Sequence, residues 1–364
     1  MVVAIVLLRG GGGEKANWAP LAESPLSGRF FPATVWTGKE MLVWGGGACS
    51  GDQCTSALAA PLSDGAAYDP AAERWRNLPQ APLAARLRPQ TVWTGKEMIV
   101  WGGNAADAAL ADGAIYNLET NQWRGMSAAP LTGRFGAAAV WTGQDLLIWG
   151  GGEGGQTARI NFNDGAAYHP ETNSWRKLSP SPLAARSAIT GVWTGKEMIV
   201  WGGFNGDDSF DDGAAFNPGT NAWRPIAKGP LSARSASANW SGQEVLYWGG
   251  GAARQSFNDG AAYNPQTDTW RPLPESPLNP RRAFASAWTG KELLIWGGGP
   301  DNSLVFYGSG AAYDPVKDSW RDLPGWNARF GPSSVWTGKQ FLVWGGIYAP
   351  AKIEVLADGA SYAP

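Results

Sequence analysis

The chain is poor in the side chains on which most metal and acid–base sites depend. Among its 364 residues there is one histidine, His169, and only 16% of the residues are charged. His169 stands in Tyr168-His169-Pro170, where other copies of the same turn have Asp or Asn, so we interpret it as a turn residue. One histidine cannot supply a Ser-His-Asp triad elsewhere in the fold. We therefore expect no catalytic residue, no metal and no cofactor, and we favour a non-catalytic protein.

Charge of one sign and long apolar runs are missing as well. The formal net charge is −2 and no run of Lys or Arg occurs, so the sequence lacks the electrostatic signature of a nucleic-acid binder. Residues 1–8 are apolar, but this run is too short to cross a bilayer and has no basic start. We expect residues 1–13 to be a leader remnant or a disordered tail, and no segment to span a membrane.

Cysteine is scarce too, with only Cys49 and Cys54 in the chain. Two cysteines without a nearby histidine are too few for a zinc site, and a thioredoxin-like pair would have two intervening residues instead of four. We favour a disulfide that closes a small loop, which would place the protein in the periplasm or outside the cell. Two free thiols on a flexible loop are the alternative.

Glycine and tryptophan, in contrast, are abundant, with 50 and 22 residues, and they recur in register. The segment from Val92 to Gly103 reads Val-Trp-Thr-Gly-Lys-Glu-Met-Ile-Val-Trp-Gly-Gly, and close copies of it occur throughout the chain. The copies begin at Trp36, Trp93, Trp141, Trp193, Trp240, Trp288 and Trp336. Two apolar runs joined by a Thr-Gly turn predict a β-hairpin, because glycine supplies the positive φ of the turn. Seven such units can bury sheet faces that one unit cannot, which predicts a single large domain.

Each unit divides into four predicted strands, which we name a to d. In the second unit they lie at about residues 87–93, 97–101 and 113–116 and around Trp123. The Gly-Gly after strand b, the tyrosine in strand c and the tryptophan in strand d resemble the kelch-repeat family, over residues 14–364. The resemblance is to the bacterial type, similar to the central domain of galactose oxidase without its copper site. It implies an all-β fold, a seven-bladed β-propeller of four-stranded antiparallel blades.

The two ends of the chain predict how the ring closes. Residues 359–362 match strand c of the seventh unit, and no strand d follows them. Residues 14–18, which end at Trp18, match the start of strand d in the third unit. We therefore expect the N-terminal strand to complete the last blade, which removes an exposed edge and favours a monomer. In total, 21 of the 22 tryptophans belong to the repeat, and we expect them to pack between adjacent blades.

An arginine opens strand a in every unit. These residues are Arg29, Arg86, Arg134, Arg186, Arg234, Arg281 or Arg282, and Arg329. In a propeller they would form a collar at one mouth of the central channel, where guanidinium groups could bind carboxylates. The resemblance supports this role, because some kelch domains bind acidic peptides with arginines at this position. The alternative is that each arginine pairs with the aspartate of the Asp-Gly that opens strand c. In the sixth unit Ser309 replaces that aspartate.

Further departures from the repeat lie in units six, seven and one, which are neighbours in a closed ring. They are Trp326, which belongs to no repeat position, and Phe330, Tyr348 and Phe30. Aromatic side chains beside arginines suit a peptide or a sugar. We call the face that carries the b–c and d–a connections the top face, and we expect the ligand there, since these loops vary most in length.

Three functions remain open. We favour a binding module that takes an acidic peptide, a protein or a small saccharide at the top face. The first alternative is a cofactor-free sugar mutarotase, similar to the kelch-type sialic acid mutarotases, in which Arg29 or Arg329 would bind a sugar carboxylate and Glu153 or Asp208 would act as the base. The second alternative is a passive structural scaffold.

Overall fold

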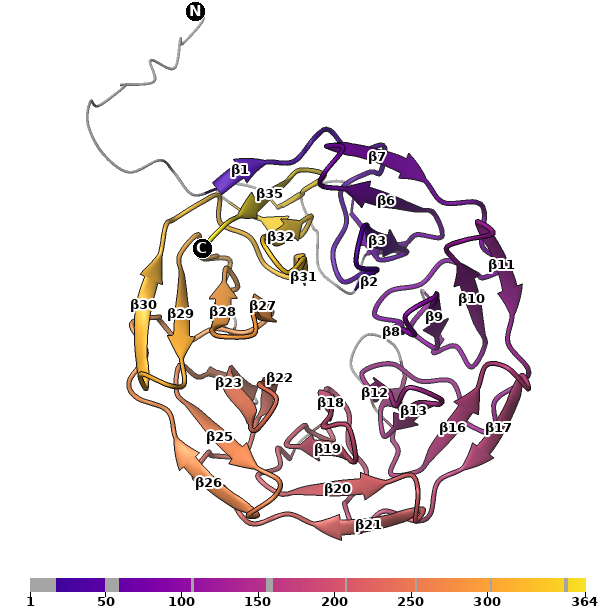
Figure 1. The fold of residues 1–364 in the computed structure, drawn as a ribbon, viewed down its shortest axis with the longest axis vertical. Helices are drawn as coiled ribbons and strands as arrows, with labels where there is room; N and C mark the ends of the chain where they lie inside the picture. Colours follow the sequence, from indigo (N-terminus) through magenta and orange to yellow (C-terminus); the bar gives the residue numbers. More distant parts are fainter. Residues whose placement is uncertain are drawn as a thin grey trace, which may run out of the picture.

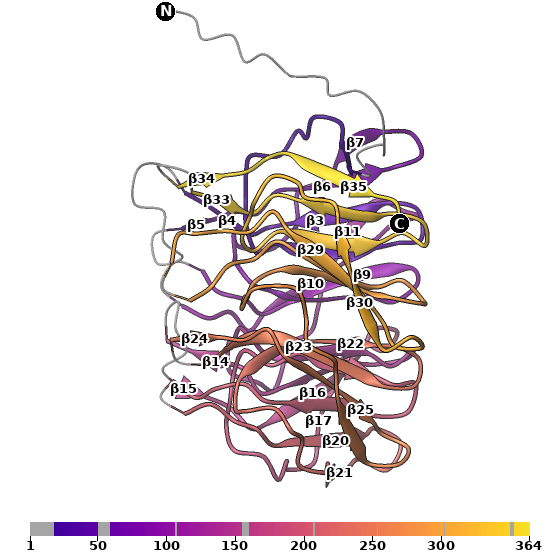
Figure 2. The same ribbon diagram turned by 90° about the vertical axis from the view of Figure 1, so that its left-hand side faces the viewer.

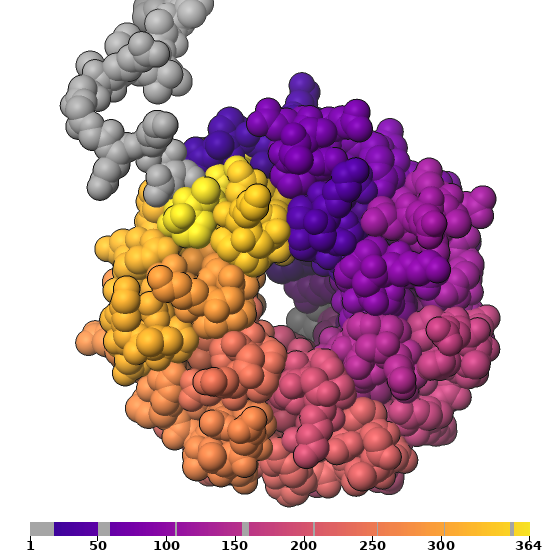
Figure 3. Space-filling view, in the orientation of Figure 1, coloured from indigo at the N-terminus to yellow at the C-terminus, as the bar shows by residue number. Residues whose placement is uncertain are grey.

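The computed structural model confirms the all-β, seven-bladed propeller. It describes residues 18–49, 59–105, 108–154, 160–206, 208–252, 254–301, 303–349 and 353–364. The predicted leader or tail at residues 1–13 lies outside this part of the chain. Seven antiparallel sheets stand around a central channel (Figure 1), and the channel is visible as a hole through the packed atoms (Figure 3). No helix in the described ranges is long and apolar enough to cross a membrane.

The strands of each blade run in chain order from the channel to the rim. Blades one and two consist of β2 (Ala33–Trp36), β3 (Met41–Trp44), β6 (Gly65–Asp69) and β7 (Arg74–Asn77), and of β8 (Gln90–Trp93), β9 (Glu97–Trp101), β10 (Gly113–Asn117) and β11 (Gln122–Gly125). Blades three and four consist of β12 (Ala138–Trp141), β13 (Leu146–Trp149), β16 (Gly165–His169) and β17 (Ser174–Lys177), and of β18 (Gly191–Trp193), β19 (Met198–Trp201), β20 (Gly213–Asn217) and β21 (Ala222–Pro225).

The remaining blades follow the same order until the ring closes. Blades five and six consist of β22 (Ser235–Trp240), β23 (Val245–Ala252), β25 (Gly260–Asn264) and β26 (Thr269–Pro272), and of β27 (Ala285–Trp288), β28 (Leu293–Trp296), β29 (Gly310–Asp314) and β30 (Ser319–Leu323). Blade seven consists of β31 (Ser333–Trp336), β32 (Phe341–Trp344), β35 (Gly359–Tyr362) and β1 (Trp18–Pro20).

Short strands extend the b–c connections of four blades, and all of them project from the same face of the ring (Figure 2). They are β4 (Gly47–Ala48), β5 (Ala60–Pro61), β14 (Gly152–Glu153), β15 (Ile160–Asn161), β24 (Gln255–Ser256), β33 (Ile347–Tyr348) and β34 (Glu354–Val355). This face is the top face expected from the lengths of the loops.

Tryptophan pairs join each blade to the next. The tryptophan before Gly-Gly in one blade packs against the strand-d tryptophan of the following blade, as Trp44 does against Trp123 at a centroid distance of 5.9 Å. The indole Nε1–H of Trp123 donates to the carbonyl oxygen of Pro79, 3.0 Å away in the preceding blade. The other pairs are Trp101–Trp175, Trp149–Trp223, Trp201–Trp270, Trp248–Trp320, Trp296–Trp18 and Trp344–Trp75. The expected packing between adjacent blades is confirmed.

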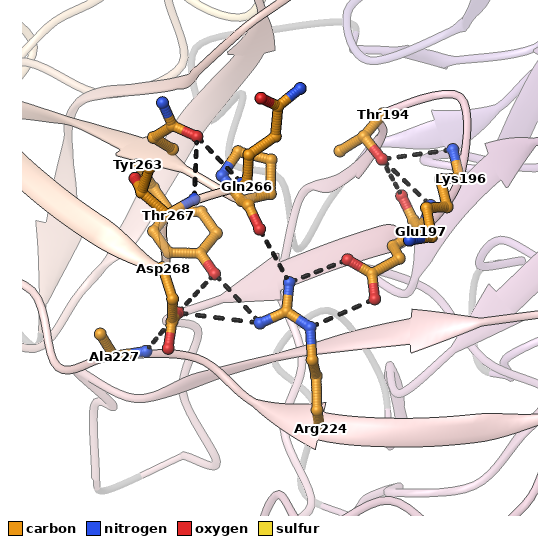
Figure 4. A network of polar contacts seen from close by, with 11 residues as sticks. Thr194, Lys196, Glu197, Arg224, Ala227, Tyr263, Gln266, Thr267 and Asp268 are labelled. Atoms are coloured by element: carbon orange, nitrogen blue, oxygen red, sulfur yellow. Dashed lines mark hydrogen bonds and ion pairs between the residues drawn. The ribbon is translucent and has the colours of Figure 1, made fainter.

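A polar clip on the outer side of the ring reinforces these contacts (Figure 4). Arg224 of β21 pairs with Glu197 of its own blade at 2.8 Å and donates to the Tyr263 hydroxyl of the next blade at 3.3 Å. That hydroxyl donates in turn to Asp268, whose carboxylate also accepts the Ala227 N–H. Burial raises the pKa of Tyr263, so it donates as a neutral phenol throughout the physiological range. The corresponding ion pairs are Arg76–Glu40, Arg124–Glu97, Arg176–Asp145, Arg271–Glu244 and Arg321–Glu292.

The seam between blades seven and one differs from the others. As predicted, the N-terminal strand closes the ring, because Trp18 pairs with Tyr362 and Pro20 with Ala360 in antiparallel register. The Leu21 N–H adds a hydrogen bond to the Gly359 carbonyl at 2.9 Å. At the clip positions, however, this blade carries Ala19 and Gln340 in place of the arginine and the acid. The seam between blades seven and one therefore lacks the ion pair, and it is held by the Trp344–Trp75 contact and by the Trp75 Nε1–H, which donates to the Ala22 carbonyl at 3.0 Å.

Deleting residues 14–22 should destabilise the propeller strongly. The deletion removes the Trp18 ring, which packs 5.2 Å from Trp296, together with the outer strand of blade seven. Loss of a buried tryptophan alone costs about 3–5 kcal/mol. Thermal unfolding of the deleted and the full chain measures the effect, and deletion of residues 1–13 is the control. Equal unfolding temperatures for the 14–22 deletion and the full chain would show that β1 is not what closes the ring.

Introducing the arginine and the glutamate of the clip into blade seven should stabilise the seam between blades seven and one. The double variant Ala19→Arg with Gln340→Glu places a guanidinium and a carboxylate where the other blades have them, beside Tyr68 of blade one. We expect a gain of about 0.5–1 kcal/mol in the free energy of unfolding, since the pair is only partly exposed. Chemical denaturation of both single variants and the double variant gives the coupling energy. Absence of any coupling would mean that the seam cannot adopt the clip geometry.

Candidate functional site

The collar arginines are buried inside their own blades. The Arg29 side chain is 0% exposed, and its two terminal nitrogens donate to Asp64 at 2.9 and 3.1 Å and to the Gly45 carbonyl at 3.1 Å. The equivalent pairs are Arg86–Asp112, Arg134–Asp164, Arg186–Asp212, Arg234–Asp259 and Arg329–Asp358. These six guanidinium groups are thus engaged by aspartates, as in the structural alternative, and ligand contact through them stays a prediction.

Aromatic rings cover most of these arginines from the loop side. Phe210, two residues before the Asp212-Gly213 pair, lies 4.0 Å from the Arg186 guanidinium carbon, and Tyr307 lies 4.4 Å from that of Arg281. Cation–π contact of this kind stabilises a buried guanidinium in addition to its ion pair. Arginine, aspartate and ring form one unit that fixes the top loops to the blade.

The sixth blade lacks the carboxylate, as the sequence predicts. Arg281 donates to the Ser309 hydroxyl at 3.1 Å and to the carbonyl oxygens of Ser309 and Gly297, all of which are neutral acceptors. Burial without a counter-ion lowers the pKa of Arg281 to about 10. Its neighbour Arg282 points to a different partner, Asp301, at 2.5 Å.

Trp326 is partly buried and packs against the core between blades six and seven. Its ring stacks on Trp18 at 5.5 Å, packs on Trp296 at 5.6 Å and covers the Arg329 guanidinium at 4.1 Å. It supports the closing strand and does not border the cavity described below. Tyr348 lies in β33, also away from that cavity.

The predicted disulfide can be followed only at one end. Cys49 packs at the margin of an apolar cluster around Phe30, Leu87 and Ile347. Cys54 lies outside the described residues, so the pairing of the two cysteines stays a prediction.

The residue two positions after each collar arginine, and not the arginine itself, belongs to the channel mouth. These residues are Phe31, Arg88, Gly136, Ala188, Ala236, Ala283 and Gly331. Six of them, all except Ala236, have left-handed backbones, including Phe31 with a φ of 51° and Arg88 with a φ of 49°. Hydrogen bonds link neighbours around the mouth, since the Arg88 N–H donates to the Phe31 carbonyl at 3.1 Å and the Gly331 N–H to the Ala283 carbonyl at 2.7 Å. We call these seven residues the mouth ring.

Sequence reasoning missed the mouth ring because it followed the most regular residue of each unit. A signal was present: the third residue of the Arg-x-x segment is glycine or alanine in five units, whereas it is Phe31 in the first and Arg88 in the second. A left-handed residue in six units, and a register shift between Ser235 and Ser237 in the fifth, interrupts the alternation of the strand. The arginine therefore turns into the blade, and the residue two places on lies at the channel.

The mouth ring borders a cavity of about 900 Å³ that opens on the top face. Its described charged residues are Arg88, Arg282 and Asp301. Among the residues predicted from the sequence, Phe30, Arg282 and Phe330 border it. Arg282 is half exposed and paired with Asp301, whose side chain is only 8% exposed. Burial raises the pKa of Asp301, and the charge of Arg282 opposes that increase.

Arg88 is the cavity's uncompensated cation. Its guanidinium carbon lies 4.7 Å from the centre of the Phe31 ring, and its side chain makes no hydrogen bond or ion pair within the described part of the chain. Burial lowers the pKa of Arg88 to about 10, and repulsion from Arg282 acts in the same direction. The group therefore remains charged at neutral pH, in a place where an anion would stabilise it.

The walls of the cavity differ in character. Phe306 and Phe330 stack at a centroid distance of 5.2 Å, and Phe31 meets Phe330 edge-on at 6.3 Å. These rings come from blades six, seven and one. Blades four and five contribute mostly small residues, among them Ala188 and Ser235, whose hydroxyl is bonded to the Ala188 carbonyl, together with Phe204 of blade four. The cavity thus has a wall of packed aromatic rings on one side and mostly small residues on the other.

Acid–base and metal chemistry find little support in the described residues. Glu153 and Asp208, the two bases expected for a mutarotase, do not border the cavity. Within the ranges that the structure describes, there is no cluster of three or more His, Cys, Asp or Glu residues that could hold a metal ion. His169 lies at the bottom turn of blade three, 2.8 Å from Asp145, and so occupies the expected turn position.

Comparison with known families supports the assignment of the repeat. A family model described as the KLHDC2/KLHL20/DRC7 Kelch-repeats domain matches residues 31–223 and, in a second overlapping match, residues 136–346. No curated protein matches the chain.

Replacing Ser309 with Asp should stabilise blade six. The new carboxylate would meet the Arg281 guanidinium where the other blades have their aspartate, and we expect a gain of about 1 kcal/mol for this half-exposed pair. Asp64→Ser in blade one is the matched reverse change and should lower the free energy of unfolding. Chemical denaturation compares both variants with the parent chain. A stability loss in Ser309→Asp would show that Arg281 is adapted to a neutral partner.

Proposed function

Because the chain belongs to the kelch-repeat family, whose model covers residues 31–346, we propose that it is a non-catalytic binding module. Kelch propellers are commonly protein-binding modules, and variable loops on one face of a repeat array are the usual place for a partner. The ligand we propose is a segment of a protein or peptide that presents a carboxylate to the cavity at the channel mouth.

The observation that carries this proposal is the position of Arg88. The collar arginines already have acceptors in their own blades, and Arg282 has Asp301. Arg88 and Arg282 both border the cavity and lie over a phenylalanine ring, but within the described residues only Arg282 has a carboxylate partner. A guanidinium can fork onto both oxygens of a carboxylate, and such charge-assisted pairs are stronger in a partly desolvated site than in water.

The backbone at Arg88 supports a role in binding. Its left-handed conformation is shared by the equivalent residues of five other units and belongs to the repeat, and at Arg88 it sets the direction of a charged side chain. Hydrogen bonding of the Arg88 N–H to Phe31 fixes this conformation, so the side chain starts from a defined position. A ligand that meets a preorganised cation loses less entropy on binding.

The two alternatives make different demands on the site. A mutarotase needs an acid–base group beside the sugar, and the carboxylate that borders the cavity, Asp301, is paired with Arg282. A passive scaffold needs no uncompensated cation in a cavity. A small saccharide with a carboxylate would satisfy Arg88, so saccharides belong in the binding test.

Arg88→Gln should abolish binding at the cavity. We expect at least a tenfold loss of affinity for ligands selected from a peptide and saccharide array, since removing one partner of a desolvated charge pair typically costs about 2–5 kcal/mol. Arg88→Lys should retain part of the affinity. Arg74→Gln, which removes an exposed charge at the outer rim, is the control, and thermal unfolding verifies that each variant folds. Equal binding by Arg88→Gln and the parent chain would refute the proposal.

A further inference from the structure

We propose that the cavity selects a ligand with a single anionic group joined to an aromatic or other large apolar group, rather than a cluster of acidic groups. This inference rests on the proposed function and specifies the chemistry of the segment that binds. In a protein partner, the motif would be one acidic residue beside an aromatic residue.

The charges of the described lining residues favour a ligand with one negative charge. Its described lining carries the cations Arg88 and Arg282 and the anion Asp301, which gives a net charge of +1. Arg282 is neutralised where it stands, because its Nε lies 2.5 Å from Asp301. One ligand anion at Arg88 brings the net charge of the described lining and the ligand to zero. A second anion would find no free cation among the described lining residues and would be repelled by Asp301.

Asp301 is held in place rather than free to withdraw. Its side chain is only 8% exposed, and its backbone N–H donates to the Ser256 hydroxyl at 2.8 Å, which ties the loop of blade six to the top hairpin of blade five. A ligand that paired with Arg282 in place of Asp301 would leave a buried carboxylate without its counter-ion, which is unfavourable in free energy. The Arg282–Asp301 pair therefore acts as a barrier against a second acidic group.

The aromatic wall supplies the other half of the recognition. Phe31, Phe306 and Phe330 form a continuous surface, with Phe31 also lying against Arg88. Leu304, 59% exposed, extends this surface outward at the rim of the cavity. An apolar group attached to the anion can pack on this surface while the anion reaches Arg88, and aromatic pairs add to the free energy of binding beyond the area that they bury.

Three matched peptides test the inference. They are acetylated and amidated Gly-Gly-Phe-Glu-Gly-Gly, Gly-Gly-Glu-Glu-Gly-Gly and Gly-Gly-Phe-Gln-Gly-Gly, with binding to the full chain measured by isothermal titration calorimetry. We expect the Phe-Glu peptide to bind at least tenfold more tightly than either of the others. In Arg88→Gln the Phe-Glu and Phe-Gln peptides should bind equally weakly.

Asp301→Asn provides a second, independent readout. The substitution raises the net charge of the described lining to +2, so the affinity for the Glu-Glu peptide should increase severalfold, whereas a merely structural role of Asp301 would lower the affinity for all peptides together. The comparison of the three peptides in the parent chain is decisive by itself should this variant fail to fold.

The outcomes separate this inference from the proposed function. If the Glu-Glu peptide binds as tightly as the Phe-Glu peptide, or if none of the three binds, the inference is wrong, while loss of array ligands in Arg88→Gln would still support a carboxylate site. If Arg88→Gln binds array ligands like the parent chain, the proposed function itself fails.

Discussion

The contact between tryptophans of successive blades is the interaction on which the rest of the molecule depends. A single blade is a small sheet whose two faces are both apolar, as the fully buried strands β3, β13 and β19 show. Neither face can be exposed to water, so each blade requires a neighbour on both sides. Seven copies of one tryptophan pair, each locked by an indole hydrogen bond to the preceding blade, meet this requirement around the whole circle. The ring, its channel and the positions of the top loops follow from that repeated contact.

The most regular charges of the sequence serve the same purpose. Arginine opens every unit, and such regularity at a channel mouth suggests a binding surface. In the fold, six of these arginines form ion pairs with aspartates, and the seventh donates hydrogen bonds to neutral acceptors around Ser309. Buried guanidinium groups anchor the top loops, and the charge that remains for a ligand comes from Arg88, a residue that appears in only one unit. In this chain the residues that recur in every unit hold the fold together, and the candidate site lies where the units differ.

The sequence predicted the architecture well because the architecture is repeated. The Trp-Thr-Gly turn, the Asp-Gly pair and the missing last strand led to seven blades and to closure by Trp18, all of which the structure confirms. The candidate site was predicted only in part. Phe30, Arg282 and Phe330 border the cavity, but Phe31, Arg88 and Asp301 were missed. Phe31 and Arg88 were missed because a left-handed backbone changes which residue of a strand meets the channel, and Asp301 because it lies in a loop without a repeat pattern. Alternation of side chains along a strand is readable from sequence, whereas a local bulge that reverses it depends on contacts with the neighbouring blade. Trp326, which we expected at the ligand site, is partly buried by its stacking on Trp18, a residue more than 300 positions away, and its contact with a ligand stays a prediction.

The mouth ring has a consequence for how such a protein can change. Each blade contributes one residue to it. Backbone hydrogen bonds join Phe31, Arg88, Ala283 and Gly331 to a neighbouring blade, whereas Ala188 and Ala236 accept a side-chain hydrogen bond from one. Five of these residues are glycine or alanine, and two are Phe31 and Arg88. A substitution at Phe31 or Arg88 alters the chemistry of the channel mouth and removes no member of the tryptophan pairs or of the buried ion pairs. The residues that stabilise the propeller are thus different from those that determine what it binds, so the binding chemistry of the mouth can change by substitution in single blades.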